Sequence, residues 1–124
     1  MITPEQLAKS GSEDANCIAL MQWAALSGIK ELKWLTHIPN GGGRDKREGA
    51  KFKAMGVRRG IPDYILPLPV KQFAGLWLEI KVGKNFPSDE QIAWQAYLRS
   101  VGYACYVCYG WEAARDKILE YLNV

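Results

Sequence analysis

One apolar run in this chain alternates in a way that predicts a strand with two unlike faces. Over residues 76–82 the even positions are aliphatic, while the odd positions are Trp77, Glu79 and Lys81. Alternate side chains of a strand share a face, so we expect the aliphatic face to pack on the core and the odd face to carry chemistry. Charged side chains are costly inside an apolar strand unless they are paired or bound to a metal. This strand therefore predicts a functional site.

A second apolar run, Tyr64–Leu66, follows Asp63 directly and is closed by two prolines. Proline removes a donor from a strand ladder, so regular pairing is expected to end there. The connection that follows is short, as in a pair of antiparallel strands. Asp63 would then join Glu79 and Lys81 on one face of the sheet.

Periodicity and turn residues outside this hairpin predict the remaining helices and strands. Three-and-four spacing of apolar residues indicates helices, which Ser or Thr caps at the start and glycine ends. The expected elements are a short helix starting at Thr3, helices at 13–27, 47–55, 88–100 and 111–122, and strands at 32–38 and 103–109. The order helix, three strands with a small helix inserted, helix, strand, helix predicts an α/β (α+β) fold with a mixed central β-sheet flanked by helices.

The composition indicates a single domain over residues 1–124, with a short N-terminal extension at 1–11. The chain has 124 residues, 48% of them hydrophobic and 23% charged, which is ordinary for a globular protein with one core. No run approaches the ~20 apolar residues of a membrane span, and the N-terminus lacks the pattern of a signal peptide. Three cysteines, an odd number, argue against a disulfide framework. Cys105 and Cys108 are predicted on opposite faces of their strand. We expect a cytoplasmic protein that contacts no membrane.

Positive charge is concentrated just upstream of Asp63. The net charge is +3, but residues 44–59 contain seven basic and two acidic side chains, a net charge of +5, so the rest of the chain carries −2. The basic residues are Arg44, Lys46, Arg47, Lys51, Lys53, Arg58 and Arg59. Such a stretch suits the neutralisation of phosphates. A solvated helix and loop explain it equally well.

Four blocks of sequence, in this order, resemble the virus-type replication-repair nuclease (VRR-NUC) domain of the PD-(D/E)xK nuclease superfamily. Pro62-Asp63 and Glu79-Ile80-Lys81 match the superfamily motif. The narrower resemblance rests on His37-Ile38-Pro39-Asn40-Gly41-Gly42, Gly56-Val57-Arg58-Arg59-Gly60-Ile61-Pro62-Asp63, Glu79-Ile80-Lys81 and Ser88-Asp89-Glu90-Gln91. It covers the chain from about Glu13 onward and implies a core similar to that of restriction endonucleases.

The paired carboxylates predict a divalent cation. Asp63 and Glu79 repel each other when held close together, and Mg²⁺, which binds oxygen ligands, relieves this; Mn²⁺ should also fit. By resemblance, the backbone carbonyl of Ile80 is a third ligand. Lys81 is expected to orient water or stabilise charge that develops on phosphate, because neighbouring carboxylates favour its charged form.

Three further positions have both a structural and a functional interpretation. Glu13 suits the helix dipole in the first turn, and it also lies where related nucleases carry a helix acid that reaches the metal. Gln91 completes a capping box with Ser88, and by resemblance it belongs to the site. Asn40, with His37, is expected at the rim, where it is structural or faces DNA.

Together these features predict a metal-dependent DNA endonuclease that hydrolyses phosphodiester bonds. The resemblance implies branched or replication-repair DNA such as Holliday junctions, and a stand-alone protein of phage type that acts as a homodimer. A non-catalytic DNA-binding accessory module for phage recombination or packaging is the alternative. A restriction-type enzyme is less favoured, because no added recognition segment is visible.

Overall fold

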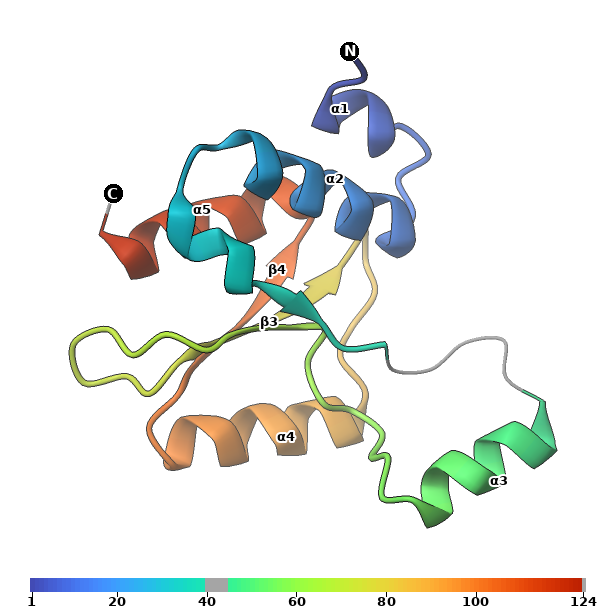
Figure 1. Ribbon diagram of the computed structural model, residues 1–124. Coiled ribbons are helices and arrows are strands. Elements are labelled where there is room, and N and C mark those ends of the chain that lie inside the picture. Colours follow the sequence, from blue (N-terminus) through green and yellow to red (C-terminus); the bar gives the residue numbers. More distant parts are fainter. Residues whose placement is uncertain (40–44, 124) are drawn as a thin grey trace.

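Four strands form one mixed sheet with helices on both faces (Figure 1). The computed structural model describes residues 1–39 and 45–123. The strands are β1 (Thr36–His37), β2 (Tyr64–Leu66), β3 (Leu76–Lys81) and β4 (Ala104–Tyr109), and they lie side by side in this order. Strand β2 is antiparallel to both β1 and β3, whereas β4 runs parallel to β3. The expected mixed sheet is therefore present.

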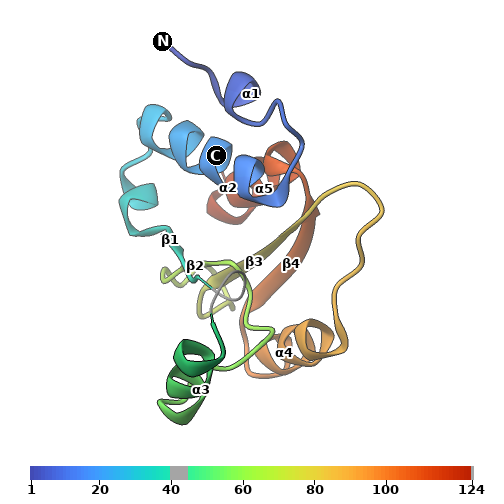
Figure 2. The same cartoon turned by 90° about the vertical axis from the view of Figure 1, so that its right-hand side faces the viewer.

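The helices follow the predicted order, with one additional turn. They are α1 (Pro4–Leu7), α2 (Glu13–Leu26), the 3₁₀ helix η1 (Lys30–Trp34), α3 (Lys46–Ala54), α4 (Asp89–Ser100) and α5 (Trp111–Leu122). Thr3, Ser12 and Ser88 cap α1, α2 and α4 as expected, with capping boxes at Thr3 and Ser88. Helices α2 and α5 lie on one side of the sheet and α4 lies on the other (Figure 2). None of the helices in the described residues has the length and apolar content needed to cross a bilayer.

Strand β3 is buried on both faces, which corrects the expectation of one core face and one chemical face. Leu78 and Ile80 join the main core with α2 and α5. On the opposite face, Trp77 packs with Leu98 of α4 and Cys105 of β4 in a second core. The alternation along β3 is as predicted, but α4 covers the Trp77 end of the odd face. Chemistry is therefore confined to the Glu79 end of this face.

The strand predicted at 32–38 is wrong over most of its length. Leu32 and Leu35 are both buried while Trp34 is 60% exposed, a spacing of three that suits the turn of a 3₁₀ helix. Only Thr36 and His37 pair with β2. The 3₁₀ helix occupies the chain up to Trp34, with Leu35 as its C-cap, so the pairing with β2 begins only at Thr36. Residues 40–44, which include Asn40 and Arg44, lie outside the described part of the chain.

Helix α3 stands away from the rest of the molecule (Figures 1 and 2). None of its residues is buried. Asp45 caps its start by accepting a hydrogen bond from the Glu48 amide at 2.7 Å. The chain returns from α3 through residues 55–62 to Asp63, so the predicted basic stretch leads directly to the hairpin.

Candidate active site

The sheet brings Asp63 and Glu79 together at the point where β2 begins. Tyr64 pairs with Leu78, and the same register continued by one step places Asp63 opposite Glu79. The Asp63 Oδ2 atom accepts a hydrogen bond from the Ile80 backbone amide at 2.7 Å. Asp63 directly precedes Tyr64, the first residue of β2, and its side chain thus takes the hydrogen bond of the Ile80 amide next to the ladder. This bond fixes one carboxyl group against the strand that carries the other.

Glu79 is almost completely enclosed, and only one of its oxygens has a partner. The residue is 2% exposed, and its Oε2 atom accepts a hydrogen bond from Gln91 Nε2 at 2.9 Å. Its Oε1 atom is buried and has no hydrogen-bond partner among the described residues. Burial, followed by the charge of Asp63, raises the pKa of Glu79 to about 8. Burial also raises the pKa of Asp63, against the hydrogen bond from Ile80.

Gln91 closes the predicted capping box and also contacts Glu79. Its Oε1 atom accepts a hydrogen bond from the Ser88 amide at 2.8 Å and closes the capping box of α4. Its Nε2 atom reaches Glu79 on β3. The amide side chain therefore ties the first turn of α4 to the buried carboxyl group through Oε2 alone.

Lys81 and Glu13 act on the acid pair through charge. Lys81 lowers the pKa of Glu79 and Glu13 raises the pKa of Glu79 and Asp63, although burial remains the largest cause of both shifts. Within the described residues, Lys81 forms no ion pair with Glu79. Glu13 Oε2 instead accepts a hydrogen bond from Asn85 Nδ2 at 3.2 Å. Glu13 thus lies at the rim of the pair, held by the loop that follows β3.

The donor set fits Mg²⁺ better than a structural metal. In the described ranges, no three His, Cys, Asp or Glu side chains form a group that could hold an ion. Mg²⁺ does not need such a cage, since it is usually held by one or two carboxylates with water and substrate phosphate. A buried acceptor without a partner, such as Glu79 Oε1, is destabilising unless something satisfies it. Asp63, Glu79 and the carbonyl of Ile80 therefore match the predicted ligands in type.

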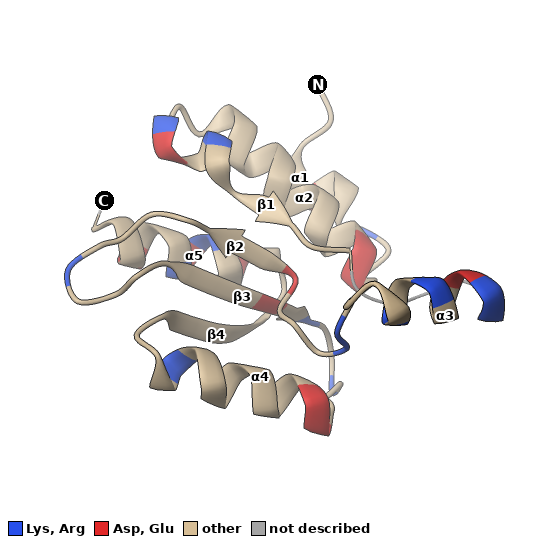
Figure 3. Ribbon diagram, turned by 60° about the horizontal axis from the view of Figure 1, so that its bottom comes forward, with Lys and Arg blue, Asp and Glu red and all other residues tan. Residues whose placement is uncertain are grey.

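The basic stretch is exposed and available to a polyanion. Figure 3 shows Lys and Arg along α3 and acidic positions at the start of β2 and within β3. The described members are all exposed, and none forms an ion pair within the described chain: Lys46, Arg47, Lys51, Lys53, Arg58 and Arg59. His37 is exposed on β1, and its ring centroid lies 5.0 Å from that of Tyr64. Burial raises the pKa of Asp63, and His37 lowers it in part. It therefore lies at the rim, as predicted.

Two contacts that the sequence did not indicate hold the segment before Asp63 against α4. Trp94 Nε1 donates a hydrogen bond to the Arg59 carbonyl at 3.0 Å. Gly60 has φ +91°, and a Cβ atom built there would lie 2.6 Å from the carbonyl carbon of Glu90. The glycine before Ile61-Pro62 could have suggested a close backbone approach, but nothing local identified α4 as the neighbour.

Comparisons with known proteins agree with this geometry. No family model matches the chain, and no curated protein matches it. A solved structure described as a VRR_NUC domain protein aligns with a TM-score of 0.78 and 29% sequence identity, over 90% of this chain and 88% of that chain. The fold class and the resemblance inferred from the four sequence blocks are thereby confirmed. In fold and in sequence, the chain is thus similar to a VRR-NUC domain protein, a protein of nuclease type.

Proposed function

We propose that this protein is a metal-dependent DNA endonuclease that hydrolyses phosphodiester bonds at the Asp63–Glu79 pair. The observation that carries the proposal is the buried Glu79 carboxyl group. Gln91 holds one of its oxygens, while the other has no partner in the part of the chain that the structure describes. A binding-only protein gains nothing from two carboxyl groups of raised pKa beside a basic surface. A nuclease needs them to hold a cation against phosphate.

Each residue has a distinct role in this proposal. Asp63, Glu79 and the Ile80 carbonyl hold the metal, and Gln91 fixes the orientation of Glu79. Bound Mg²⁺, or Mn²⁺ in its place, would polarise the phosphate and lower the pKa of a water molecule at neutral pH. Lys81 stabilises negative charge on the phosphate. Glu13, which accepts a hydrogen bond from Asn85, is an outer ligand of the metal. Lys46, Arg47, Lys51, Lys53, Arg58 and Arg59 bind the DNA backbone, together with Arg44 and Asn40 outside the described residues.

We further propose branched DNA, such as a Holliday junction, as the substrate. The domain spans residues 1–124 with its extension at 1–11, and a homodimer would place two such sites on the two strands of a junction. A protein of stand-alone phage type would act in the cytoplasm of its bacterial host. These points rest on the sequence resemblance and on the exposed basic residues of α3.

The test is cleavage of end-labelled linear duplex, flap and four-way-junction DNA in EDTA, Mg²⁺ or Mn²⁺. The isosteric variant Glu79→Gln removes a ligand charge with little change in shape, and Glu112→Gln removes an exposed charge in the first turn of α5. We expect metal-dependent products with the wild type and with Glu112→Gln, and none with Glu79→Gln. Salt-sensitive binding without cleavage of any substrate would instead identify the DNA-binding accessory module.

A further inference from the structure

The loop between β3 and α4, residues 82–88, presents a phenylalanine almost fully to solvent. Phe86 is 84% exposed, compared with 60% for Trp34, the next most exposed aromatic residue among those described. Exposing a large apolar side chain forgoes the stabilisation that its burial would give. The loop connects β3, which carries Glu79 and Lys81, with α4, which carries Gln91. Phe86 therefore lies in a segment that joins two elements of the candidate active site.

The residue before Phe86 is tied to two sides of the site. The Asn85 side chain donates to Glu13 Oε2 at 3.2 Å, and the Asn85 carbonyl accepts a hydrogen bond from Tyr109 Oη at 2.8 Å. Tyr109 lies opposite Lys81 in the parallel pair of β4 with β3. These bonds hold Asn85 between the helix acid and the strand end.

The residues after Phe86 are fixed as well. Pro87 restricts the backbone, and the Ser88 amide donates to Gln91 Oε1 at 2.8 Å. Gln91 in turn donates to Glu79. Phe86 is two residues from Ser88, so their Cα atoms lie within about 7 Å of each other. An aromatic ring is therefore presented on a constrained backbone, two residues before Ser88, which Gln91 links to Glu79.

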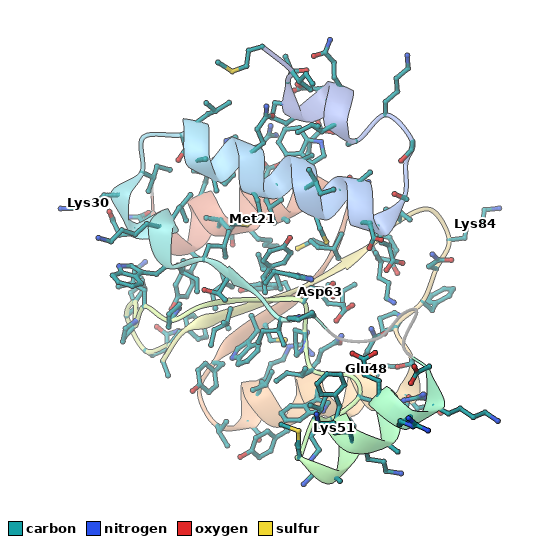
Figure 4. All side chains as sticks on the ribbon, turned by 45° about the vertical axis from the view of Figure 1, so that its right-hand side comes forward. Met21, Lys30, Glu48, Lys51, Asp63 and Lys84 are labelled. Atoms are coloured by element: carbon teal, nitrogen blue, oxygen red, sulfur yellow. The ribbon has the colours of Figure 1, made fainter. Side chains whose placement is uncertain are left out.

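The neighbours of Phe86 favour nucleic acid over an apolar protein partner. Lys84 is exposed on the same loop, and Figure 4 shows it extending away from the body, with Asp63 nearer the centre of the molecule. A loop that exposes both an aromatic ring and a lysine can bind single-stranded nucleic acid, because the ring stacks on a base while the cation binds a phosphate. The positive charge of Lys84 next to an exposed ring thus favours a nucleic acid as the partner of this loop.

We propose that Phe86 stacks on an unpaired base of the DNA, one or two nucleotides from the phosphate held at Asp63 and Glu79. The proposal rests on the nuclease function given above and specifies its substrate: DNA with an unstacked nucleotide beside the cut. Lys84 binds the phosphate next to that base. Since every base has a π-face, this contact selects unpaired structure rather than sequence.

A cycle that combines a protein variant with a DNA modification tests the stacking directly. Phe86→Ala and Phe86→Trp are compared with wild type on branched DNA that carries a normal or an abasic nucleotide at each position around the cut. Stacking of one base is worth about 5- to 160-fold, so Phe86→Ala should lose that much kcat/KM on the normal substrate. At one position, an abasic nucleotide should lower kcat/KM of the wild type by the same factor. The same abasic nucleotide should cause no further loss in Phe86→Ala. Phe86→Trp should retain wild-type rates, and so should Trp34→Ala, the matched exposed aromatic on η1.

A binding measurement separates this proposal from the nuclease function. 2-Aminopurine placed at the same positions should be quenched by wild type and Phe86→Trp in EDTA, but not by Phe86→Ala. Absence of cleavage by the wild type in both metals would refute the nuclease while leaving this result to stand. Equal losses on normal and abasic DNA at every position, unchanged quenching in Phe86→Ala, or a change of oligomeric state in that variant would overturn the stacking proposal.

Discussion

The Glu79→Gln substitution should stabilise the metal-free protein at neutral pH while it abolishes catalysis. Burial and the charge of Asp63 raise the pKa of Glu79 from 4.5 to about 8. Between these two values the unfolded state has released its proton and the native state has kept it, so the free energy of unfolding decreases as pH rises. Below pH 4.5 both states are protonated, and Glu79 has no effect on this pH dependence.

The magnitude follows from the size of the shift. Each unit of pKa corresponds to about 1.4 kcal/mol, so at pH 7 the glutamate costs the native state up to ~3 kcal/mol relative to low pH. Glutamine does not titrate. Its amide oxygen can still accept the hydrogen bond from Gln91 Nε2, and its amide nitrogen can donate to Asp63. Asp63 also has a raised pKa, so a smaller pH dependence should remain in the variant.

Urea unfolding in EDTA between pH 4.5 and pH 8 measures this difference. We expect the variant to match the wild type at the acidic end and to exceed it by ~2–3 kcal/mol at pH 7. Added Mg²⁺ should then stabilise the wild type and not the variant, because a ligand stabilises only the state that binds it. Glu112→Gln should follow the wild type throughout. A constant stability difference between Glu79→Gln and wild type across this pH range would refute the reasoning.

The structure supports three further predictions. Gly60→Ala should lower stability by at least ~2 kcal/mol and reduce cleavage, because its Cβ atom would collide with the start of α4, whereas Gly56→Ala, with φ +99° and open space, bears only the conformational cost of about 1–2 kcal/mol; equal urea midpoints would contradict this. Lys81→Arg should keep measurable nuclease activity and Lys81→Ala should not; inactivity of both in a single-turnover assay would favour a proton-transfer role. Replacing Lys51 and Lys53 by glutamine should reduce the slope of log K against log salt by ~1.8, and an unchanged slope in a DNA-binding titration would exclude these two from phosphate contact.

The hairpin of β2 and β3 could be predicted from sequence because its determinants are local. The alternation over 76–82 fixes which side chains share a face, and the two prolines limit the pairing of β2. These features correctly placed Asp63 directly before β2 and Glu79 and Lys81 on the neighbouring strand β3. Capping residues set the helix starts for the same reason, since the relevant contacts join residues three apart.

The errors arose where distant segments decide the outcome. The run at 32–38 has the composition of a strand, but the buried packing of Leu32 and Leu35 favours a 3₁₀ helix there, and only Thr36 and His37 pair with β2. Trp77 belongs to a second core because α4 crosses that face. The raised pKa of Glu79 likewise depends on burial beneath elements far along the chain, and no spacing in the sequence encodes it.

The detached position of α3 has a consequence for how this protein can diverge. A helix without buried residues adds little to the folding free energy, so its length and charge can change without a loss of stability. Phosphate affinity can therefore be adjusted there by single substitutions that leave the acid pair intact. For the proposed nuclease, substitutions in α3 would therefore change the nucleic acids that it binds without altering the packing of the sheet.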